Sequence, residues 1–364
     1  MGRGSPSIAC FISPHGFGHA ARACAVMAAL YEQVPTLAFE IYSTVPEWFF
    51  AESLAAPTAV HPVLTDVGLV QRTALREDLN ATAQRLRSFL PFDDGTLDGI
   101  AEELRRTRCR GVLCDVPAMG LAVARRAGVP SVLVENFTWD WIYSSYADSC
   151  PALEPVAQLL RREYATADLR LTTTPACQIE PGTHQVAPVS RKPRRPPAAL
   201  RAELGVPDAM PMVLLTMGGI PWRYDSLREL SRRARAFFVV PGGADTARSS
   251  DSLLALAHHS PHYHPDLVHA ADAVVGKLGY STLAETFHAG CRFAFIPRSH
   301  FPESPALASF ALAEMPAIQI SEDEFLRDAW IDRLDELLAL RRPTAPRPDG
   351  AAQAARLIAE LLAL

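Results

Sequence analysis

The chain has 364 residues, of which 49% are hydrophobic and 21% charged, and its formal net charge is −5. This is the composition of a folded globular protein, and the length favours two domains because single cores rarely grow beyond about 250–300 residues. The mildly acidic balance argues against a nucleic-acid-binding surface and against a polybasic membrane anchor.

Seven cysteines lie scattered along the chain without a C-x-x-C pair. An odd, dispersed set of this kind is typical of reduced thiols in the cytosol. The apolar stretch at 8–12 is too short for a signal peptide, and no apolar run reaches the roughly 20 residues of a membrane span. We therefore expect a soluble, cytoplasmic protein.

The first half of the chain alternates short apolar runs with longer amphipathic stretches. The pattern predicts strands at 7–13, 37–43, 110–115 and 131–135, and helices at 19–33 and 119–127. Strands separated by helices indicate βαβ units and a mostly parallel sheet. We expect this first α/β domain to occupy residues 1–189.

A proline-rich segment with a short basic run follows and is interpreted as a solvated linker at 190–210. The same alternation then resumes. It predicts strands at 212–217, 236–240, 273–276 and 292–297, and helices at 281–288 and 322–340. A second α/β domain is therefore expected at 211–345, and the Ala/Leu-rich tail at 346–364 is expected to contain a C-terminal helix.

Polar side chains and glycines follow the first predicted strand, where ligands bind in open α/β sheets. Gly16 and Gly18 allow the backbone to approach a ligand closely. His19 would stand near the start of a helix, whose dipole keeps an imidazole neutral and able to accept a proton. A tight turn with a capping histidine, or a metal pair made by His15 and His19, remains the alternative, although no third zinc ligand is spaced obviously.

Two later strand ends also carry polar groups. Asp115 would project from the same sheet edge as His19, where it can accept from the imidazole N–H and fix its tautomer. The alternative is that Asp115 caps the helix near Pro117. The segment 135–143 combines aromatic and short polar residues, which suits a sugar or polyol; a buried aromatic helix start is the alternative.

In the second half, glycine-bearing loops follow three strands, at 216–219, 241–245 and 276–285. Backbone amides in such loops can hold phosphate oxygens, although glycines serve ordinary turns equally well. In the third loop, Ser281 and Thr282 suit a diphosphate and Glu285 suits ribose hydroxyls, whereas a capping box made by the same residues is the alternative. The histidines at 258, 259, 262 and 264 are interpreted as an exposed loop rather than a metal site.

Placed in order, these segments resemble a known family. The chain closely resembles the glycosyltransferase-like N-terminal half of plant L-arabinokinases and its stand-alone bacterial relatives. More distantly it is similar to the bacterial N-acetylglucosaminyltransferase of peptidoglycan synthesis and to plant UDP-dependent glycosyltransferases. The segments that carry the resemblance span about residues 7–310: HGFGHAAR (15–22), TDVGLVQ (65–71), CDVPAMG (114–120), ENFTWDWIY (135–143), TMGGIP (216–221), HPDLVHAADAVVGKLGYSTLAE (264–285) and FIPRSHFPESP (295–305).

The resemblance implies a GT-B fold, in which two Rossmann-like domains have parallel sheets facing across a cleft and the second domain holds the nucleotide. The C-terminal helix is expected to cross back to the first domain. The implied activity is an inverting, metal-independent transfer of a sugar from a nucleotide-sugar, with UDP as the expected nucleotide, to an unidentified acceptor hydroxyl. No cofactor is expected beyond this co-substrate.

By carry-over, His19 is the expected catalytic base and Asp115 its partner. The acceptor site is expected at His15, Asn136, Trp139 and Asp140. The nucleotide-sugar site is expected to comprise Gly16, Gly18, Gly218, Gly219, Gly242, Lys277, Gly279, Tyr280, Ser281, Thr282, Glu285 and Glu303. The loop at 220–222, Ile-Pro-Trp, departs from the small residues of the family and is expected to narrow access to the phosphates.

Two other functions fit the same sequence. A nucleotide-sugar 2-epimerase uses the same architecture, and a non-catalytic nucleotide-sugar sensor would bind without turnover. A glycoside hydrolase is less attractive because no carboxylate pair stands at the predicted strand ends. The expected partners are the small-molecule donor and acceptor, and no oligomeric state follows from the sequence.

Overall fold

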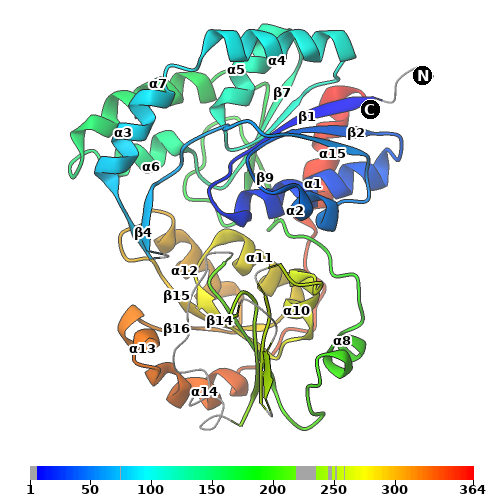
Figure 1. Ribbon diagram of the computed structural model, residues 1–364, viewed down its shortest axis with the longest axis vertical. Coiled ribbons are helices and arrows are strands. Elements are labelled where there is room, and N and C mark those ends of the chain that lie inside the picture. The colour runs from blue at the N-terminus through cyan, green and yellow to red at the C-terminus, as the bar shows by residue number, and fades with distance from the viewer. Residues whose placement is uncertain (1–5, 74, 219–234, 245–247, 251, 258) are drawn as a thin grey trace. The chain divides into compact units, whose positions relative to one another are not determined.

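The computed structural model describes residues 6–73, 75–218, 235–244, 248–250, 252–257 and 259–364. The chain divides into two compact units (Figure 1). Unit 1 consists of Met1–Thr73, Glu77–Ser190 and Pro348–Leu364, and unit 2 consists of Ala74–Arg76 and Arg191–Arg347. Unit 1 therefore contains both ends of the chain, and most of unit 2 is inserted between them.

Unit 1 is built on a seven-stranded sheet whose strand pairings are parallel, in the order β3-β2-β1-β6-β7-β8-β9. Its strands are β1 (Ser7–Ile12), β2 (Ala38–Tyr42), β3 (Thr58–His61), β6 (Val112–Asp115), β7 (Ser131–Glu135), β8 (Leu169–Thr173) and β9 (His184–Val186). The chain starts in the middle of the sheet, extends it to one side through β3, and then returns to continue on the other side from β6. The strand order therefore reverses between β1 and β6, and such a switch point opens a crevice for ligands at the carboxyl ends of the strands.

Helices cover both faces of this sheet. They are α1 (Phe17–Gln33), α2 (Glu47–Ser53), α3 (Leu79–Phe89), α4 (Asp94–Thr107), α5 (Ala118–Ala127), α6 (Trp139–Ser145), η1 (Pro151–Leu153), α7 (Glu154–Tyr164) and α15 (Gly350–Leu362). Two further short strands, β4 (Gln71–Thr73) and β5 (Arg76–Glu77), pair with each other.

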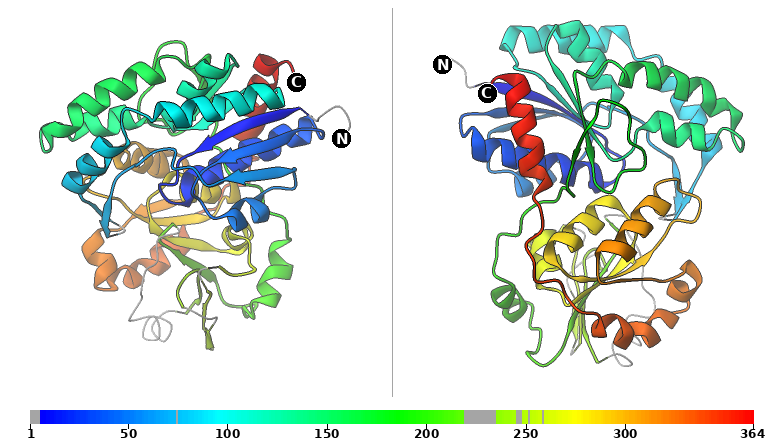
Figure 2. Two further views of the ribbon diagram at one scale, coloured as in Figure 1. Left: turned by 45° about the horizontal axis from the view of Figure 1, so that its top comes forward. Right: turned by 180° about the vertical axis from the view of Figure 1, so that it is seen from behind.

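The alternation of side chains along β1 explains the two layers. Ile8, Cys10 and Ile12 point into a core that includes residues of α1, α2 and α15, and α15 lies beside this face in Figure 2. Phe11 points the other way, because side chains alternate along a strand. There α5 packs so closely that a Cβ on Gly120 would lie 2.7 Å from the Phe11 ring. Since both faces are covered, β1 is buried along its whole length and apolar from Ile8 to Ile12.

Unit 2 repeats this plan. Its seven-stranded sheet has the order β12-β13-β11-β10-β14-β15-β16, in which only the edge pair β12 and β13 is antiparallel among the pairings described. The strands are β10 (Met212–Thr216), β11 (Phe237–Val240), β12 (Arg248–Ser250), β13 (Leu253–Ala255), β14 (Ala273–Lys277), β15 (Arg292–Ile296) and β16 (Ala317–Gln319). The switch point lies between β10 and β14, at the position that corresponds to β1 and β6 in unit 1.

Two apolar cores flank the second sheet. Met212 and Leu214 belong to the core that includes residues of α8, α10, α11 and α12, whereas Val213 and Leu215 belong to the core that includes residues of α13, η2 and α14. The helices are α8 (Pro197–Glu203), α10 (His264–Ala270), α11 (Tyr280–Ala289), α12 (Ser304–Glu314), α13 (Glu322–Leu326), η2 (Ala329–Arg333) and α14 (Leu334–Ala339).

Two segments differ from the sequence-based expectation. The single helix predicted at 322–340 is wrong: α13 ends at Leu326, and Asp328 takes a left-handed conformation with φ 58°, which an L-residue in a continuous helix does not adopt. Within the expected linker at 190–210, the chain forms α8, whose Leu200 is buried in the core of unit 2. This segment is therefore folded against the second sheet.

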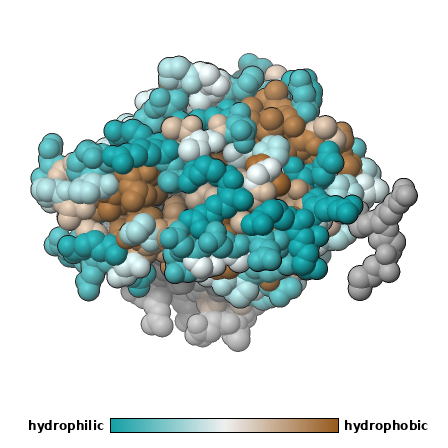
Figure 3. Space-filling view, turned by 90° about the horizontal axis from the view of Figure 1, so that it is seen from above, coloured by the Kyte–Doolittle hydropathy of each residue, from teal (hydrophilic) through white to brown (hydrophobic). Residues whose placement is uncertain are grey.

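The surface is mixed in character. On the face shown in Figure 3, hydrophilic residues cover much of the area and hydrophobic side chains gather in patches between them. Among the helices that the structure describes, none is both long and apolar enough to cross a membrane.

Candidate active site

His19 lies in the first turn of α1, directly beyond the carboxyl end of β1. The helix starts after Gly16, whose φ of 76° favours glycine, and no side chain caps this end. His19 is 8% exposed, and its Nδ1 lies 3.0 Å from Oδ1 of Asp115. Because an ionised carboxylate can only accept, Nδ1 carries the proton, and Nε2 is left as the nitrogen that can accept one.

Asp115 ends β6, on the other side of the switch point, and is 1% exposed. Arg22 holds it through two hydrogen bonds, from Nε to Oδ2 at 2.9 Å and from Nη2 to Oδ1 at 2.7 Å. Burial raises the pKa of Asp115, but the charge of Arg22 and the hydrogen bonds from His19 and Arg22 bring it below its ordinary value. The carboxylate is therefore ionised at neutral pH and fixes the orientation of the imidazole.

The helix-capping alternative for Asp115 is wrong. The residue before α5 is Pro117, and no side chain caps that helix. Val116 between them has φ 77°, which is strained for a β-branched residue. This strained turn joins the strand end that carries Asp115 to the helix that follows.

Asp66 is a third charged residue of this site, and sequence reasoning missed it. It follows β3 in the loop and is 7% exposed. The Ser13 hydroxyl donates to Oδ1 at 2.9 Å, and the Trp139 indole N–H donates to Oδ2 at 2.9 Å. Burial raises the pKa of Asp66 to about 6; His19 and these two hydrogen bonds lower it, and Asp115 raises it. The signals available were its place in the TDVGLVQ segment and the serine at the end of β1.

Trp139 is the centre of an aromatic cluster around the two histidines. Its ring lies 5.3 Å from the His15 ring, edge to face, and 6.3 Å from the His19 ring, and it stacks on Tyr143 at 5.7 Å. His15 packs against Gly68, where a Cβ would lie 2.6 Å from Nδ1, so the loop after β3 fits closely over this ring. The cluster fixes both histidines in place.

Three of the expected acceptor-binding residues are buried. Asn136 and Trp139 are each 1% exposed, and Asp140 is 5% exposed. Asn136 Oδ1 accepts from Arg22 at 2.5 Å, and Asp140 Oδ2 accepts from Arg161 at 3.3 Å. These contacts favour the alternative of a buried aromatic helix start, in which the three side chains support the site from within. Only His15 among the expected acceptor residues is partly exposed.

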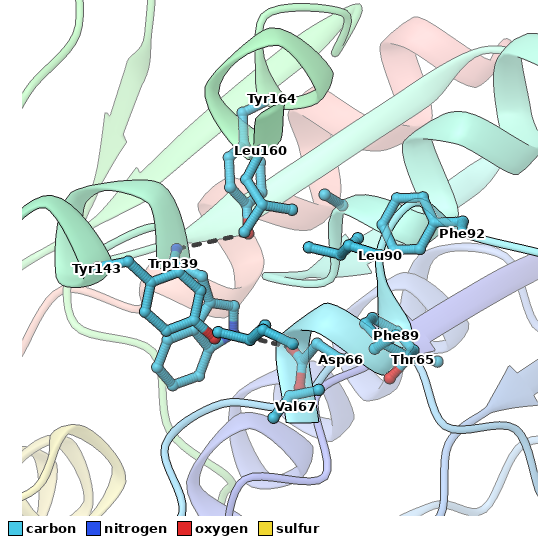
Figure 4. Close-up of a pocket in the computed structure, with 12 residues that line it drawn as sticks. Thr65, Asp66, Val67, Phe89, Leu90, Phe92, Trp139, Tyr143, Leu160 and Tyr164 are labelled. Carbon is cyan, nitrogen blue, oxygen red and sulfur yellow. Dashed lines mark hydrogen bonds between the residues drawn. The ribbon is translucent and has the colours of Figure 1, made fainter. Parts of the chain in front are cut away.

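A small apolar pocket opens behind Trp139 and Asp66 (Figure 4). Its cavity volume is only about 10 Å³, which is room for about one water molecule. In Figure 4, Trp139 and Tyr143 lie on one side of the pocket and Leu90 and Phe92 on the other. The indole of Trp139 and the carboxylate of Asp66 therefore contact both this pocket and the histidine site.

In unit 2, the expected donor residues gather at the carboxyl ends of β10, β11 and β14. Gly218 follows β10 with φ 67°, and a Cβ there would lie 3.6 Å from Cε of Lys277 and 3.9 Å from Oγ1 of Thr282. The structure therefore brings these three residues together at the switch point. Gly242 follows β11 with φ 71°. Gly219 and the Ile-Pro-Trp loop at 220–222 lie outside the described residues.

Helix α11 starts at this point and provides a site suited to an anion. Its N-cap is Gly279, no side chain caps it, and Tyr280, Ser281 and Thr282 form the first turn. The positive end of a helix dipole and the amides of the first turn favour phosphate oxygens. The close approach of the strand before it requires glycine, because a Cβ on Gly276 would lie 1.8 Å from a carbonyl oxygen of β10.

Two basic side chains accompany this helix start. Burial lowers the pKa of Lys277 to about 7, Arg298 lowers it as well, and Glu303 raises it. Arg298 Nη2 lies 3.8 Å from Oε2 of Glu303, which is 4% exposed. A dianionic ligand would therefore meet a cluster with excess positive charge, which its own charge would stabilise.

Glu285 lies one turn inside α11 and is already engaged. Arg191 donates to Oε1 at 3.0 Å, and His264 Nδ1 lies 2.7 Å from Oε2. Burial raises the pKa of Glu285, but Arg191 and His264 lower it by more than burial raises it. The pKa of Glu285 therefore lies below its ordinary value. The capping-box alternative is therefore wrong, and Glu285 serves first as an anchor for Arg191 and His264.

This anchor also corrects two interpretations of the sequence. Arg191 belongs to the basic run that was expected to be solvated, yet it is 8% exposed. His264, which was expected in an exposed loop, begins α10 and is half-buried against Glu285, and His262 is half-buried too. His258 lies outside the described residues, and among those described no cluster of three or more His, Cys, Asp or Glu is arranged to hold a metal ion.

No protein-family model matches the chain. It is 26% identical over 338 residues to an L-arabinokinase of Arabidopsis thaliana, a match that covers 91% of this chain and 32% of that protein. The chain thus spans about a third of the length of this relative. It is also 23% identical over 284 residues to a protein of Methanopyrus kandleri described as an uncharacterized glycosyltransferase, covering 71% of this chain and 78% of the other.

Solved structures share the whole architecture. The spinosyn forosaminyltransferase SpnP superposes with a TM-score of 0.61 at 15% identity and covers 98% of this chain and 95% of its own. A UDP-glucosyltransferase of Polygonum tinctorium gives a TM-score of 0.61 at 12% identity, with all of both chains covered. These matches confirm the predicted fold class and the predicted resemblance: the chain has two Rossmann-like units, as in the GT-B fold, and is similar in sequence to part of an L-arabinokinase.

Proposed function

We propose that this protein is a glycosyltransferase that moves a sugar from a UDP-sugar to a hydroxyl group of a small-molecule acceptor, with inversion at the anomeric carbon and without a metal ion. The observation that carries the proposal is the buried hydrogen bond between His19 and Asp115 at the switch point of unit 1. The names of the relatives and the fold support it, since the solved structures include one complexed with UDP and a UDP-glucosyltransferase.

His19 acts in this proposal as the general base. Its Nε2 takes the proton of the acceptor hydroxyl as that oxygen attacks the anomeric carbon, while the bond from this carbon to the phosphate oxygen breaks and its electron pair leaves with the diphosphate. A single displacement of this kind inverts the anomeric configuration. Asp115 stabilises the imidazolium that forms, and Arg22 keeps Asp115 ionised and in position.

The donor is held in unit 2. We place the diphosphate beside Gly218, near which Lys277 and Thr282 lie. The amides at the start of α11 and the hydroxyl of Ser281 would be further donors to it. These donors stabilise the charge that develops on the departing diphosphate, which is the role that a metal ion has in other transferases. Gly219, Gly242, Tyr280 and Glu303 complete the proposed donor site, with Glu303 on the side of the sugar.

The test replaces His19 by alanine. We expect His19→Ala to lower the rate of sugar transfer by about 10²–10⁴-fold while UDP affinity, measured by calorimetry, stays within about twofold, because unit 2 is untouched. His184→Ala is the matched control, because this exposed histidine stands at the amino end of β9, the edge strand of the same sheet, whereas His19 follows the carboxyl end of β1. Transfer that survives in His19→Ala at the wild-type rate would refute the assignment of the base.

Product analysis separates transfer from the other functions that fit the fold. The wild-type protein is incubated with a panel of UDP-sugars (UDP-glucose, UDP-galactose, UDP-arabinose and UDP-N-acetylglucosamine), with and without candidate acceptors. Conversion of the donor to its 2-epimer without acceptor would identify an epimerase instead. Thermal stabilisation by UDP with neither release of UDP nor transfer would identify a binding protein.

A further inference from the structure

Asp66 is a second buried carboxylate of the site, and the roles proposed for His19 and Asp115 give no reason for its presence. Asp115 is held by a guanidinium group, whereas the hydrogen-bond donors of Asp66 are the neutral hydroxyl of Ser13 and the neutral indole of Trp139. Burying an ionised carboxylate against neutral donors costs free energy. An asparagine would fill the same space and could bond both neighbours, because the Ser13 hydroxyl can accept as well as donate.

The position of Asp66 connects three elements of the site. Ser13 directly follows β1, Asp66 lies in the loop after β3, and Trp139 is the first residue of α6. Through Trp139, Asp66 fixes the ring that lies edge to face on His15 and beside His19. It also lies close enough to His19 and Asp115 to interact with both of them electrostatically.

We infer that Asp66 is a positioning residue of the transfer reaction, which holds the Trp139 indole against the two histidines and places a second negative charge near the imidazolium formed when His19 accepts a proton. The inference rests on the proposed function of His19. Asp66 itself exchanges no proton with the substrates: the acceptor proton goes to His19, and the carboxylate stabilises the resulting charge.

The charged state of Asp66 changes within the range in which such an enzyme works. The groups that face it are His19 on α1, Asp115 on β6, Tyr143 on α6 and Tyr164 on α7. Burial raises the pKa of both tyrosines, so they stay neutral, and Asp115 stays ionised. Since the pKa of Asp66 is about 6, its charge is present above this pH and lost below it. Loss of the Asp66 charge therefore contributes to the acid side of the rate profile.

The test is Asp66→Asn in the full-length protein, with Asp168→Asn as the matched control. Asp168 accepts from the backbone and hydroxyl of Ser131 at the amino ends of β7 and β8, at the edge of the sheet opposite to His19. The assay follows release of UDP from the panel of UDP-sugars between pH 5 and 9. We expect Asp66→Asn to lower kcat by about tenfold at pH 8 with little change in KM for the donor, and to make the acid limb less steep because one titrating group is gone. Asp168→Asn should keep the wild-type profile.

A second measurement does not depend on turnover. The indole N–H resonance of Trp139, followed by NMR, should change with pH around 6 in the wild type, because Asp66 takes up a proton there, and this change should be absent in Asp66→Asn. A wild-type rate profile together with an unaltered pH dependence of the Trp139 indole resonance in Asp66→Asn would overturn the inference. If no sugar in the panel is turned over even by the wild type, the proposed function fails, and the NMR result still decides whether an ionised Asp66 holds the indole of Trp139.

Discussion

Replacing Asp66 by asparagine should make the protein more stable at neutral pH. The folded structure raises the pKa of this carboxyl from its ordinary 3.8 to about 6, chiefly because it is buried. The folded state therefore disfavours the ionised form. The contribution of the carboxyl to stability is complete below pH 4 and is lost as the pH rises through about 6. Asp66→Asn does not titrate, so its advantage over the wild type grows with pH.

The size of the effect follows from the two pKa values. The interval between 3.8 and about 6 corresponds to about 3 kcal/mol of unfolding free energy above pH 7, and roughly half of that at pH 5. The hydrogen bonds to Ser13 and Trp139 can be kept by the amide, so they alter the difference little. Asp66→Asn should thus gain about 3 kcal/mol of unfolding free energy. Such a gain is expected where a buried charge is kept for function at the expense of stability.

Urea unfolding of the wild type and Asp66→Asn at pH 5, 6, 7 and 8 measures this difference. Asp115→Asn serves as the opposite control, because the pKa of Asp115 lies below its ordinary value and the substitution breaks the buried ion pair with Arg22. That variant should lose about 3–5 kcal/mol at neutral pH. Two results would contradict a raised pKa of Asp66 in the folded state. One is an Asp66→Asn variant that is less stable than the wild type at pH 8, and the other is a difference in unfolding free energy that is the same at every pH.

Two further predictions concern unit 2. UDP should bind the wild type more weakly as the pH rises through the pKa of Lys277, about 7, and the affinity should fall by up to about tenfold per pH unit. Calorimetry should find a smaller pH dependence of the affinity in Lys277→Arg, because arginine stays charged. Equal pH profiles of UDP affinity in the two proteins would exclude Lys277 from the phosphate site. Glu285→Gln should cost about 3–5 kcal/mol in urea unfolding, because it breaks the buried ion pair between Arg191 and Glu285. A loss below about 1 kcal/mol would show that this ion pair is not needed for stability.

The fold was predictable because its central strands are buried on both faces. The continuous apolar runs 8–12 and 212–215 lie within β1 and β10, and the helices between the strands follow the expected alternation. The strands that sequence analysis missed lie toward the edges of the sheets. β3 (Thr58–His61) is exposed or half-buried along its length, and β9 (His184–Val186) has only three residues. Short, half-exposed strands carry neither a long apolar run nor a clear alternation.

The candidate site was predictable only in part. His19 and Asp115 stand at strand ends, where parallel sheets place their ligands, so the sequence indicates both of them. Arg22 was missed because an arginine within an alanine-rich helix is expected to face solvent, yet it is 2% exposed and bonded to Asp115. Asp66 has no strand pattern immediately before it. Contacts that join residues about a hundred positions apart depend on the complete topology, which local patterns do not provide.

The C-terminal helix has a consequence for how this chain is made. Ala354, Ala355 and Ile358 of α15 are wholly buried in the core that also contains α1 and the first strand. During synthesis from the N-terminus, residues 191–347 are therefore complete before the first-formed segment can finish packing. Until then, the apolar surface of α1 that α15 covers lacks its partner. Although α1 is synthesised before the residues of unit 2, it can therefore complete its packing only after α15 has left the ribosome.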